Sequence, residues 1–186
     1  VNMININVNG TKNMVDIALD NKVRKYIQIS SIAAVGRPKT QFQLNEETKW
    51  EESPNNSTYA KSKYLSELEV WRGIAEGLNA TILNPAFILG PGDLNKSSTQ
   101  LFKLVLDKSK FYSDGNLNFV DVRDVSTAVL KVLESNKDGE RFIICGGTTK
   151  FKELFEKIAS KFSIKPPAIE LKPWILEIIW RLEAIR

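Results

Sequence analysis

The fold of this chain is decided by the stretch YIQISS at residues 26–31, a short apolar run that ends in two hydroxyl side chains. A run of this length between polar segments predicts a buried strand. After a long polar segment, residues 58–76 carry apolar side chains at helical spacing and begin with the motif YAKSK at residues 59–63. We therefore expect a strand with Ser31 at its carboxyl end, followed by a helix that carries Tyr59 and Lys63.

Helix and strand patterns alternate along the rest of the chain. Strands separated by helices of about ten residues or more imply parallel crossover connections. The predicted fold class is therefore α/β, a mainly parallel sheet with helices on both faces. We expect helices at residues 10–20, 58–76, 97–108, 125–133, 151–162 and from 173 onward, and strands at 26–30, 80–83, 117–122 and 141–145, with Pro85 breaking the second strand.

Composition sets limits on the partners and the location. The chain has 186 residues, of which 42% are hydrophobic and 26% charged, typical of one globular domain. No apolar run approaches the ~20 residues of a membrane span, so a cytoplasmic protein without a membrane partner is expected. The net charge of +4 is spread without a basic, aromatic-rich stripe, so no nucleic-acid partner is expected. The single cysteine, Cys145, reads as a small core residue, with a catalytic thiol as the minor alternative.

The chain contains no histidine. This absence removes Ser-His-Asp catalysis, Cys-His catalysis, two-histidine zinc sites and imidazole bases, and no metal site is expected. Acid–base chemistry would have to use tyrosine, lysine or carboxylates.

Tyr59 and Lys63 lie four residues apart, which makes them neighbours on a helix surface. The lysine charge would favour the phenolate of Tyr59 and so create a proton-transfer pair. Taken alone, the motif favours a solvated helix face with a tyrosine and two lysines. Its context strengthens the first interpretation, because Ser30, Ser31 and the segment at residues 84–86 follow predicted strands, and ligands bind beyond the carboxyl ends of parallel strands.

The loop at residues 36–57 exceeds the ~12–15 residues that usually connect elements in a compact domain. Its acidic stretch at residues 46–52 could cover a substrate or form a solvated lid, and the sequence leaves both open.

Five motifs occur in a fixed order: NVNGT at residues 7–11, ISSIAAVG at 29–36, YAKSK at 59–63, LNPAFILGPG at 83–92 and FVDVRDV at 119–125. Together they resemble the extended short-chain dehydrogenase/reductases, above all the NAD-dependent epimerase/dehydratase group and its dihydroflavonol-reductase-like branch. The resemblance implies a Rossmann-like sheet, NAD or NADP as cofactor, and a small hydroxyl- or carbonyl-bearing substrate. A homodimer is compatible with it.

The resemblance also implies roles for the catalytic residues. Tyr59 would be the acid or base that moves a proton to or from the substrate oxygen. Lys63 would support the Tyr59 phenolate and bind the cofactor ribose, and Ser31 would donate to the reacting oxygen.

Further positions are implied to contact the cofactor. Asn7 matches the family's Asn-Val-x-Gly-Thr position, and Tyr59 and Lys63 would also face the cofactor. The nicotinamide pocket would be lined by Pro85, Ala86 and Phe87.

Two departures from the family pattern affect what is expected. Asn84 stands where many sugar-nucleotide enzymes have arginine, which argues against a nucleotide-sugar substrate. No Gly-rich turn for the pyrophosphate occurs, so we expect a piece without the N-terminal half of the fold, inactive by itself. Residues 1–148 would then be the C-terminal part of a dinucleotide-binding domain with substrate-subdomain insertions, and residues 149–186 would be substrate-subdomain helices.

Three functional classes remain. The first is an NAD(P)-dependent oxidoreductase, epimerase or dehydratase with a Ser-Tyr-Lys site. The alternatives are a noncatalytic NAD(P)-binding regulator on the same fold and an interaction protein that uses the final helix, with Trp174 and Trp180.

Overall fold

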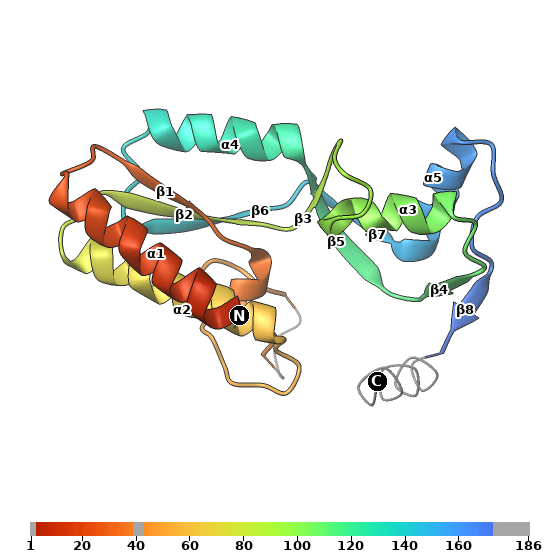
Figure 1. The fold of residues 1–186 in the computed structure, drawn as a ribbon, viewed down its shortest axis with the longest axis horizontal. Coiled ribbons are helices and arrows are strands. Elements are labelled where there is room, and N and C mark those ends of the chain that lie inside the picture. The colour runs from red at the N-terminus through yellow and green to blue at the C-terminus, as the bar shows by residue number, and fades with distance from the viewer. Residues whose placement is uncertain (1–2, 39–42, 173–186) are drawn as a thin grey trace. The chain divides into compact units, whose positions relative to one another are not determined.

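The computed structural model describes residues 3–38 and 43–172. The chain forms two compact units, one of residues 1–86 and 122–145 and the other of residues 87–121 and 146–186 (Figure 1). We describe each unit by itself.

The first unit is built on a parallel sheet, as predicted. Its strands are β1 (Tyr26–Ile29), β2 (Ala80–Pro85) and β6 (Glu140–Ile144), in the order β1-β2-β6. The central strand β2 is buried along its whole length. The carboxyl ends of β1 and β2 therefore lie side by side, with Ile29 opposite Leu83.

Helices cover both faces of this sheet (Figure 1). On one side lie α1 (Met3–Asp20) and α2 (Thr58–Ala75), which pack closely on each other, and on the other lies α4 (Val122–Glu134). The helix α1 begins at Met3 rather than at residue 10, because its asparagine-rich first turns have low helix propensity and hide the pattern. The core between α1, α2 and the sheet consists of Val15, Ala18, Val70, Leu78, Ala80 and Ile82.

Two local expectations for the first unit are wrong. Pro85 does not break the strand but is its last residue, opposite Ile144. The ladder continues past the proline, because the Ala86 N–H donates to the Ile144 carbonyl at 2.9 Å. Cys145 is exposed and not part of the core, since β6 ends one residue before it.

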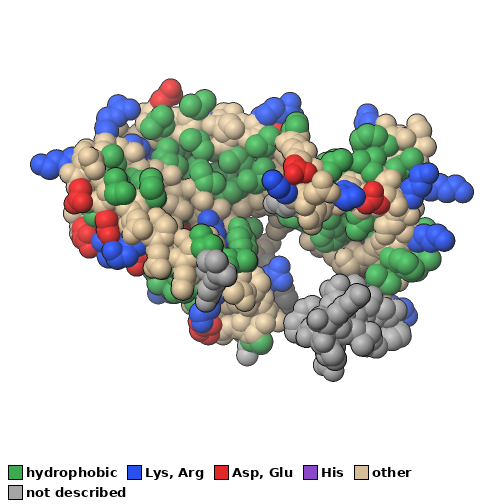
Figure 2. Space-filling model, in the orientation of Figure 1, with side chains coloured by type: hydrophobic (Ala, Val, Ile, Leu, Met, Phe, Trp, Pro, Cys, Tyr) green, Lys and Arg blue, Asp and Glu red, His purple; other side chains and the backbone are tan. Residues whose placement is uncertain are grey.

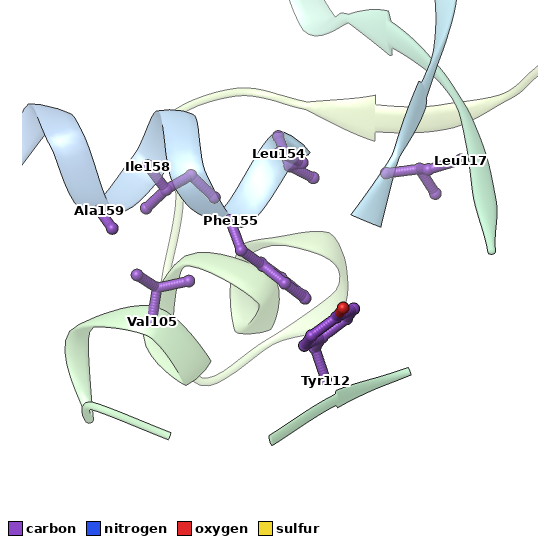
Figure 3. Close-up of a cluster of buried hydrophobic side chains, with 7 residues drawn as sticks. All are labelled: Val105, Tyr112, Leu117, Leu154, Phe155, Ile158 and Ala159. Atoms are coloured by element: carbon purple, nitrogen blue, oxygen red, sulfur yellow. The ribbon is translucent and has the colours of Figure 1, made fainter. Parts of the chain in front are cut away.

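The second unit contains short strands and two short helices. The strand β5 (Asn116–Asp121) pairs parallel with β3 (Phe87–Leu89) and antiparallel with β7 (Gly147–Lys150), while β4 (Phe111–Ser113) pairs with β8 (Ile169–Leu171). A 3-10 turn, η2 (Ser97–Thr99), precedes α3 (Gln100–Leu106), and α5 (Phe151–Lys161) follows β7. Its core joins α3, α5, β4 and β5 (Figure 3) and consists of Val105, Tyr112, Leu117, Leu154, Phe155, Ile158 and Ala159.

The sequence did not predict four of these strands, β3, β4, β7 and β8. Each has three or four residues, too few for an alternating pattern to stand out. Gly147 begins β7. The final helix expected from residue 173 lies outside the described residues, and none of the helices that are described is long and apolar enough to cross a membrane.

Candidate active site

Ser31 lies directly beyond β1 and caps the 3-10 helix η1 (Ile32–Val35). Its Oγ accepts a hydrogen bond from the Ala33 N–H at 3.2 Å. The side chain is half-buried. Because the oxygen serves as the acceptor, the hydroxyl hydrogen remains able to donate to another oxygen.

Tyr59 lies in the first turn of α2. Ser57 caps the helix just before Thr58: its Oγ accepts from the Ala60 N–H at 3.1 Å and so fixes this turn. The Tyr59 side chain is 44% exposed. Its phenol is thus accessible to a ligand while its backbone is held by the helix cap.

Lys63 reaches from α2 to the end of β1. Its Nζ donates to the Ile29 carbonyl at 3.3 Å, two residues before Ser31. Burial lowers the pKa of Lys63, and the negative charge of Glu67 opposes that effect. The structure therefore brings Lys63 to the strand end that carries Ser31, with Tyr59 one helical turn away.

A buried polar network lies beside Lys63, and the sequence analysis missed it. Glu67 is 0% exposed. It accepts from Asn84 Nδ2 at 2.6 Å and from Arg141 Nη2 at 2.6 Å. The same Asn84 amide group also donates to the Ser31 carbonyl at 2.8 Å. The sequence does show a glutamate four residues after Lys63. It does not show that this glutamate is buried, because its burial depends on how α2 packs.

Opposing effects act on the pKa of the Glu67 carboxylate. Burial raises its pKa, while Arg141, Asn84 and Lys63 favour the charged form. The Ser30 hydroxyl lies near enough to favour the charged form too, but it makes no hydrogen bond of ordinary geometry within the described structure. Burial is the largest of these effects, so the net direction of the pKa is upward.

Asn7 lies on α1 and contacts α2. Its Nδ2 donates to Ser62 Oγ at 3.0 Å, and the Ser62 hydroxyl donates to the Tyr59 carbonyl at 2.8 Å. Asn7 is therefore linked through one side chain to the turn that holds Tyr59.

The residues expected around the nicotinamide belong to different units. Pro85 and Ala86 are buried at the carboxyl end of β2 in the first unit. Phe87 begins β3 in the second unit and packs against that unit's core. Their role in cofactor binding stays a prediction.

The acidic loop packs against the first unit. Glu46 accepts from the Ile143 N–H of the edge strand β6 at 3.0 Å, and the Trp50 ring stacks on Tyr64 with centroids 4.4 Å apart. A cleft of about 640 Å³ lies between this loop, α2 and β6. The described part of the loop thus packs against the β6 edge of the sheet. Neither role expected from the sequence, covering a substrate or forming a solvated lid, included this contact.

Charges on the visible face of the first unit are mixed, with basic and acidic side chains close together (Figure 2). Within the same unit, Arg72 forms ion pairs with Asp16, Glu69 and Glu76. Such exposed pairs contribute little to stability.

Comparison with known proteins gives consistent matches. The sequence profile of the NAD dependent epimerase/dehydratase family matches residues 1–145. Sterol demethylase protein B of Methylococcus capsulatus is 28% identical over 181 residues, covering 94% of this chain and 54% of that protein. Cinnamoyl-CoA reductase 2 of Arabidopsis thaliana is 30% identical over 169 residues, covering 86% of this chain and 51% of that protein.

The solved structures agree with these matches. The crystal structure of gox2253 is 33% identical and superimposes with a TM-score of 0.85, covering 98% of this chain and 57% of that one. The chain thus spans about half the length of the curated relatives it matches.

Proposed function

This chain belongs to the NAD-dependent epimerase/dehydratase family, and we propose that it carries the proton-transfer site of an NAD(P)-dependent enzyme acting on a small carbonyl- or hydroxyl-bearing substrate. Reduction, epimerisation and dehydration all fall within the proposal. The names of the relatives favour reduction of a carbonyl or thioester carbon.

One observation carries the proposal. The Lys63 ammonium lies at the carboxyl end of β1, beside Ser31, and Tyr59 stands one turn earlier on the same helix with its phenol accessible. These groups are a cation, a hydroxyl donor and a phenolic proton carrier, and they lie where parallel sheets bind ligands.

The geometry fits a nicotinamide dinucleotide. Lys63 has three N–H donors and uses one on the Ile29 carbonyl, so further donors can face ribose hydroxyls. Lys63 and Tyr59 would hold the cofactor ribose, with Pro85 and Ala86 beside the ring. When bound, the cofactor supplies or accepts the hydride.

The protein's part is to move and hold protons. During reduction, Tyr59 would give its phenolic proton to the carbonyl oxygen as negative charge develops there. Ser31 would donate its O–H to the same oxygen, and the Lys63 charge would stabilise the phenolate left behind. During oxidation the Tyr59 phenolate would take the single proton back from the substrate hydroxyl, with Ser31 hydrogen-bonded to the same oxygen.

Substitution of Tyr59 by phenylalanine tests the proposal. We expect kcat to fall by about 10²–10⁴-fold, the usual contribution of a positioned acid or base, while dinucleotide binding changes little. The measurement is loss of NADH or NADPH absorbance by the complete gene product with a panel of aldehydes, ketones and acyl-CoA thioesters, including cinnamoyl-CoA and a dihydroflavonol.

Tyr64→Phe is the matched control. Tyr64 lies on the same helix, and its ring, which stacks on Trp50, is kept by the change. We expect normal turnover from this variant. Dinucleotide binding without turnover on any substrate, and no effect of Tyr59→Phe, would instead favour a noncatalytic regulator.

A further inference from the structure

A buried carboxylate connects the residues of the proposed site. Glu67 is fully buried on α2, and both groups that it contacts at 2.6 Å, on Asn84 and Arg141, are donors. Asn84 comes from β2 and Arg141 from β6, so one side chain joins the helix to two strands. Burying a carboxylate is unfavourable unless it is paired and hydrogen-bonded.

The network ends at the proposed site on two sides. On one side, the Asn84 amide that donates to Glu67 also donates to the Ser31 carbonyl. On the other, Glu67 lies one helical turn beyond Lys63, and its charge acts directly on that ammonium. Among the described residues, Lys63 faces Glu67 and, one turn earlier on α2, Tyr59, while Glu67 faces Lys63 and Arg141.

We infer that Glu67 is a positioning residue: through Asn84 it fixes the backbone of Ser31, and through its charge it holds the Lys63 ammonium at the end of β1. Its catalytic meaning rests on the function proposed above. Glu67 does not touch the substrate in this proposal, because it is enclosed by α2, β2 and β6.

The donor groups around Glu67 predict the effect of replacing it with the uncharged glutamine. Glutamine has nearly the shape of glutamate, but its amide presents one acceptor and one donor group. Because both partners are donors, Glu67→Gln must direct an N–H₂ group at Asn84 or Arg141. The Asn84 amide then loses its fixed orientation, and Lys63 loses its neighbouring negative charge.

Two readouts on the complete gene product test this without any substrate. Amide hydrogen exchange at Ala33 and Ala34 reports on Ser31, because these N–H groups donate to Ser31 Oγ and to the Ser31 carbonyl. NMR titration of isotope-labelled lysine, assigned with Lys63→Arg, reports on Lys63. In Glu67→Gln we expect faster exchange at these two amides relative to core amides, and a Lys63 titration displaced to lower pH.

Two further variants separate the parts of the network. Asn84→Leu removes the Ser31 contact but leaves the Glu67 charge, so exchange at Ala33 and Ala34 should rise while the Lys63 titration stays close to the wild type. Asn84→Leu also tests the link from the network to Ser31 if Glu67→Gln does not fold. Glu69→Gln is the matched control, because Glu69 lies on the same helix and contacts Arg72 away from the network; both readouts should be unchanged.

The results separate this inference from the proposed function. Unchanged exchange, or an unchanged Lys63 titration, in Glu67→Gln would overturn the inference. Where the wild type turns over, kcat of Glu67→Gln should fall by about ten- to a hundredfold with KM little changed, and a wild-type kcat would also overturn it. A wild type without turnover would count against the proposed function alone, because exchange and titration still report on Glu67.

Discussion

Glu67 is fully buried, although glutamate side chains are almost never fully buried unless they are paired. An ionised carboxylate in a core is unfavourable, and pairing with a buried arginine often fails to offset the loss of hydration. The short contacts to Asn84 and Arg141 show that the chain provides partners for it. The two effects act on its pKa in opposite directions, and burial is the larger.

This balance gives a prediction for stability. A carboxyl group whose pKa is raised on folding stabilises the fold below its unfolded pKa, and that stability is lost as the pH rises through the folded pKa. Glu67→Gln does not titrate, so its unfolding free energy should rise relative to the wild type as the pH increases above about 4.3, the unfolded pKa of glutamate. The gain is about 1.4 kcal/mol for each pH unit that separates the two pKa values.

Urea unfolding of both proteins across that pH range is the measurement, with Glu69→Gln as the control. A relative stability that instead falls as the pH rises would mean that the ion pair with Arg141 outweighs burial, and that folding lowers the pKa of Glu67.

Sequence reasoning reached only part of the site at this scale. Local rules placed Lys63 on a helix and Ser31 after a strand, and Lys63 does reach the end of that strand. That Ser31, Tyr59 and Lys63 act together stays a prediction. Asn84 was noted as a strand-end residue and as a departure from the family pattern, but not as a partner of Glu67. The partnership of Glu67 with Asn84 and Arg141 joins residues 17 and 74 positions apart, and no local pattern encodes such distances.

At the scale of elements, α2 shows how a helix can be predicted while its buried face is not. Leu65, Leu68 and Trp71 have helical spacing, yet Leu68 is 43% exposed. The buried positions are Ala60, Ser62, Ser66, Glu67, Val70 and Gly73, most of them small. Small side chains let α1 approach closely, and that requirement comes from the neighbour and not from the periodicity of α2.

Gly73 is the closest point of this packing. A Cβ atom added there would lie 2.5 Å from Val15 Cγ1 and 3.1 Å from Leu78 Cδ2. Gly73→Ala should therefore destabilise the fold by about 1–3 kcal/mol, the usual effect of overpacking, despite the better helix propensity of alanine. Denaturant unfolding measures the change.

Gly10→Ala is the matched control for this prediction. Gly10 lies inside α1 with open space around it, so alanine should stabilise the helix by about 0.5–1 kcal/mol. If the two alanine variants changed the unfolding free energy equally, α1 and α2 would be packed less closely at Gly73 than the distances above indicate.

At the scale of the whole molecule, the alternation of patterns was enough to predict the parallel sheet and its helices. The second unit was predicted only in part: its two helices and β5 were expected, but β3, β4, β7 and β8 have three or four residues each and no pattern of their own. The boundaries expected at residues 148 and 149 stay a prediction.

The last prediction concerns dinucleotide binding by residues 1–186. Rossmann folds hold the pyrophosphate at a Gly-rich turn before a helix N-terminus, and no such turn occurs in this sequence. In the first unit β1 is an edge strand, paired on one side with β2 among the described residues. We therefore expect the purified chain to show no saturable NADH or NADPH fluorescence signal up to about 1 mM, the upper end of ordinary KM values.

The complete gene product, measured alongside, supplies the comparison, and circular dichroism establishes that the chain is folded when it is tested. Saturable micromolar binding by residues 1–186 would contradict this prediction. It would show that the residues around Lys63 and Tyr59 bind the dinucleotide without a Gly-rich turn for the pyrophosphate. Most of the affinity would then come from the ribose and nicotinamide side, and Lys63→Met should abolish it.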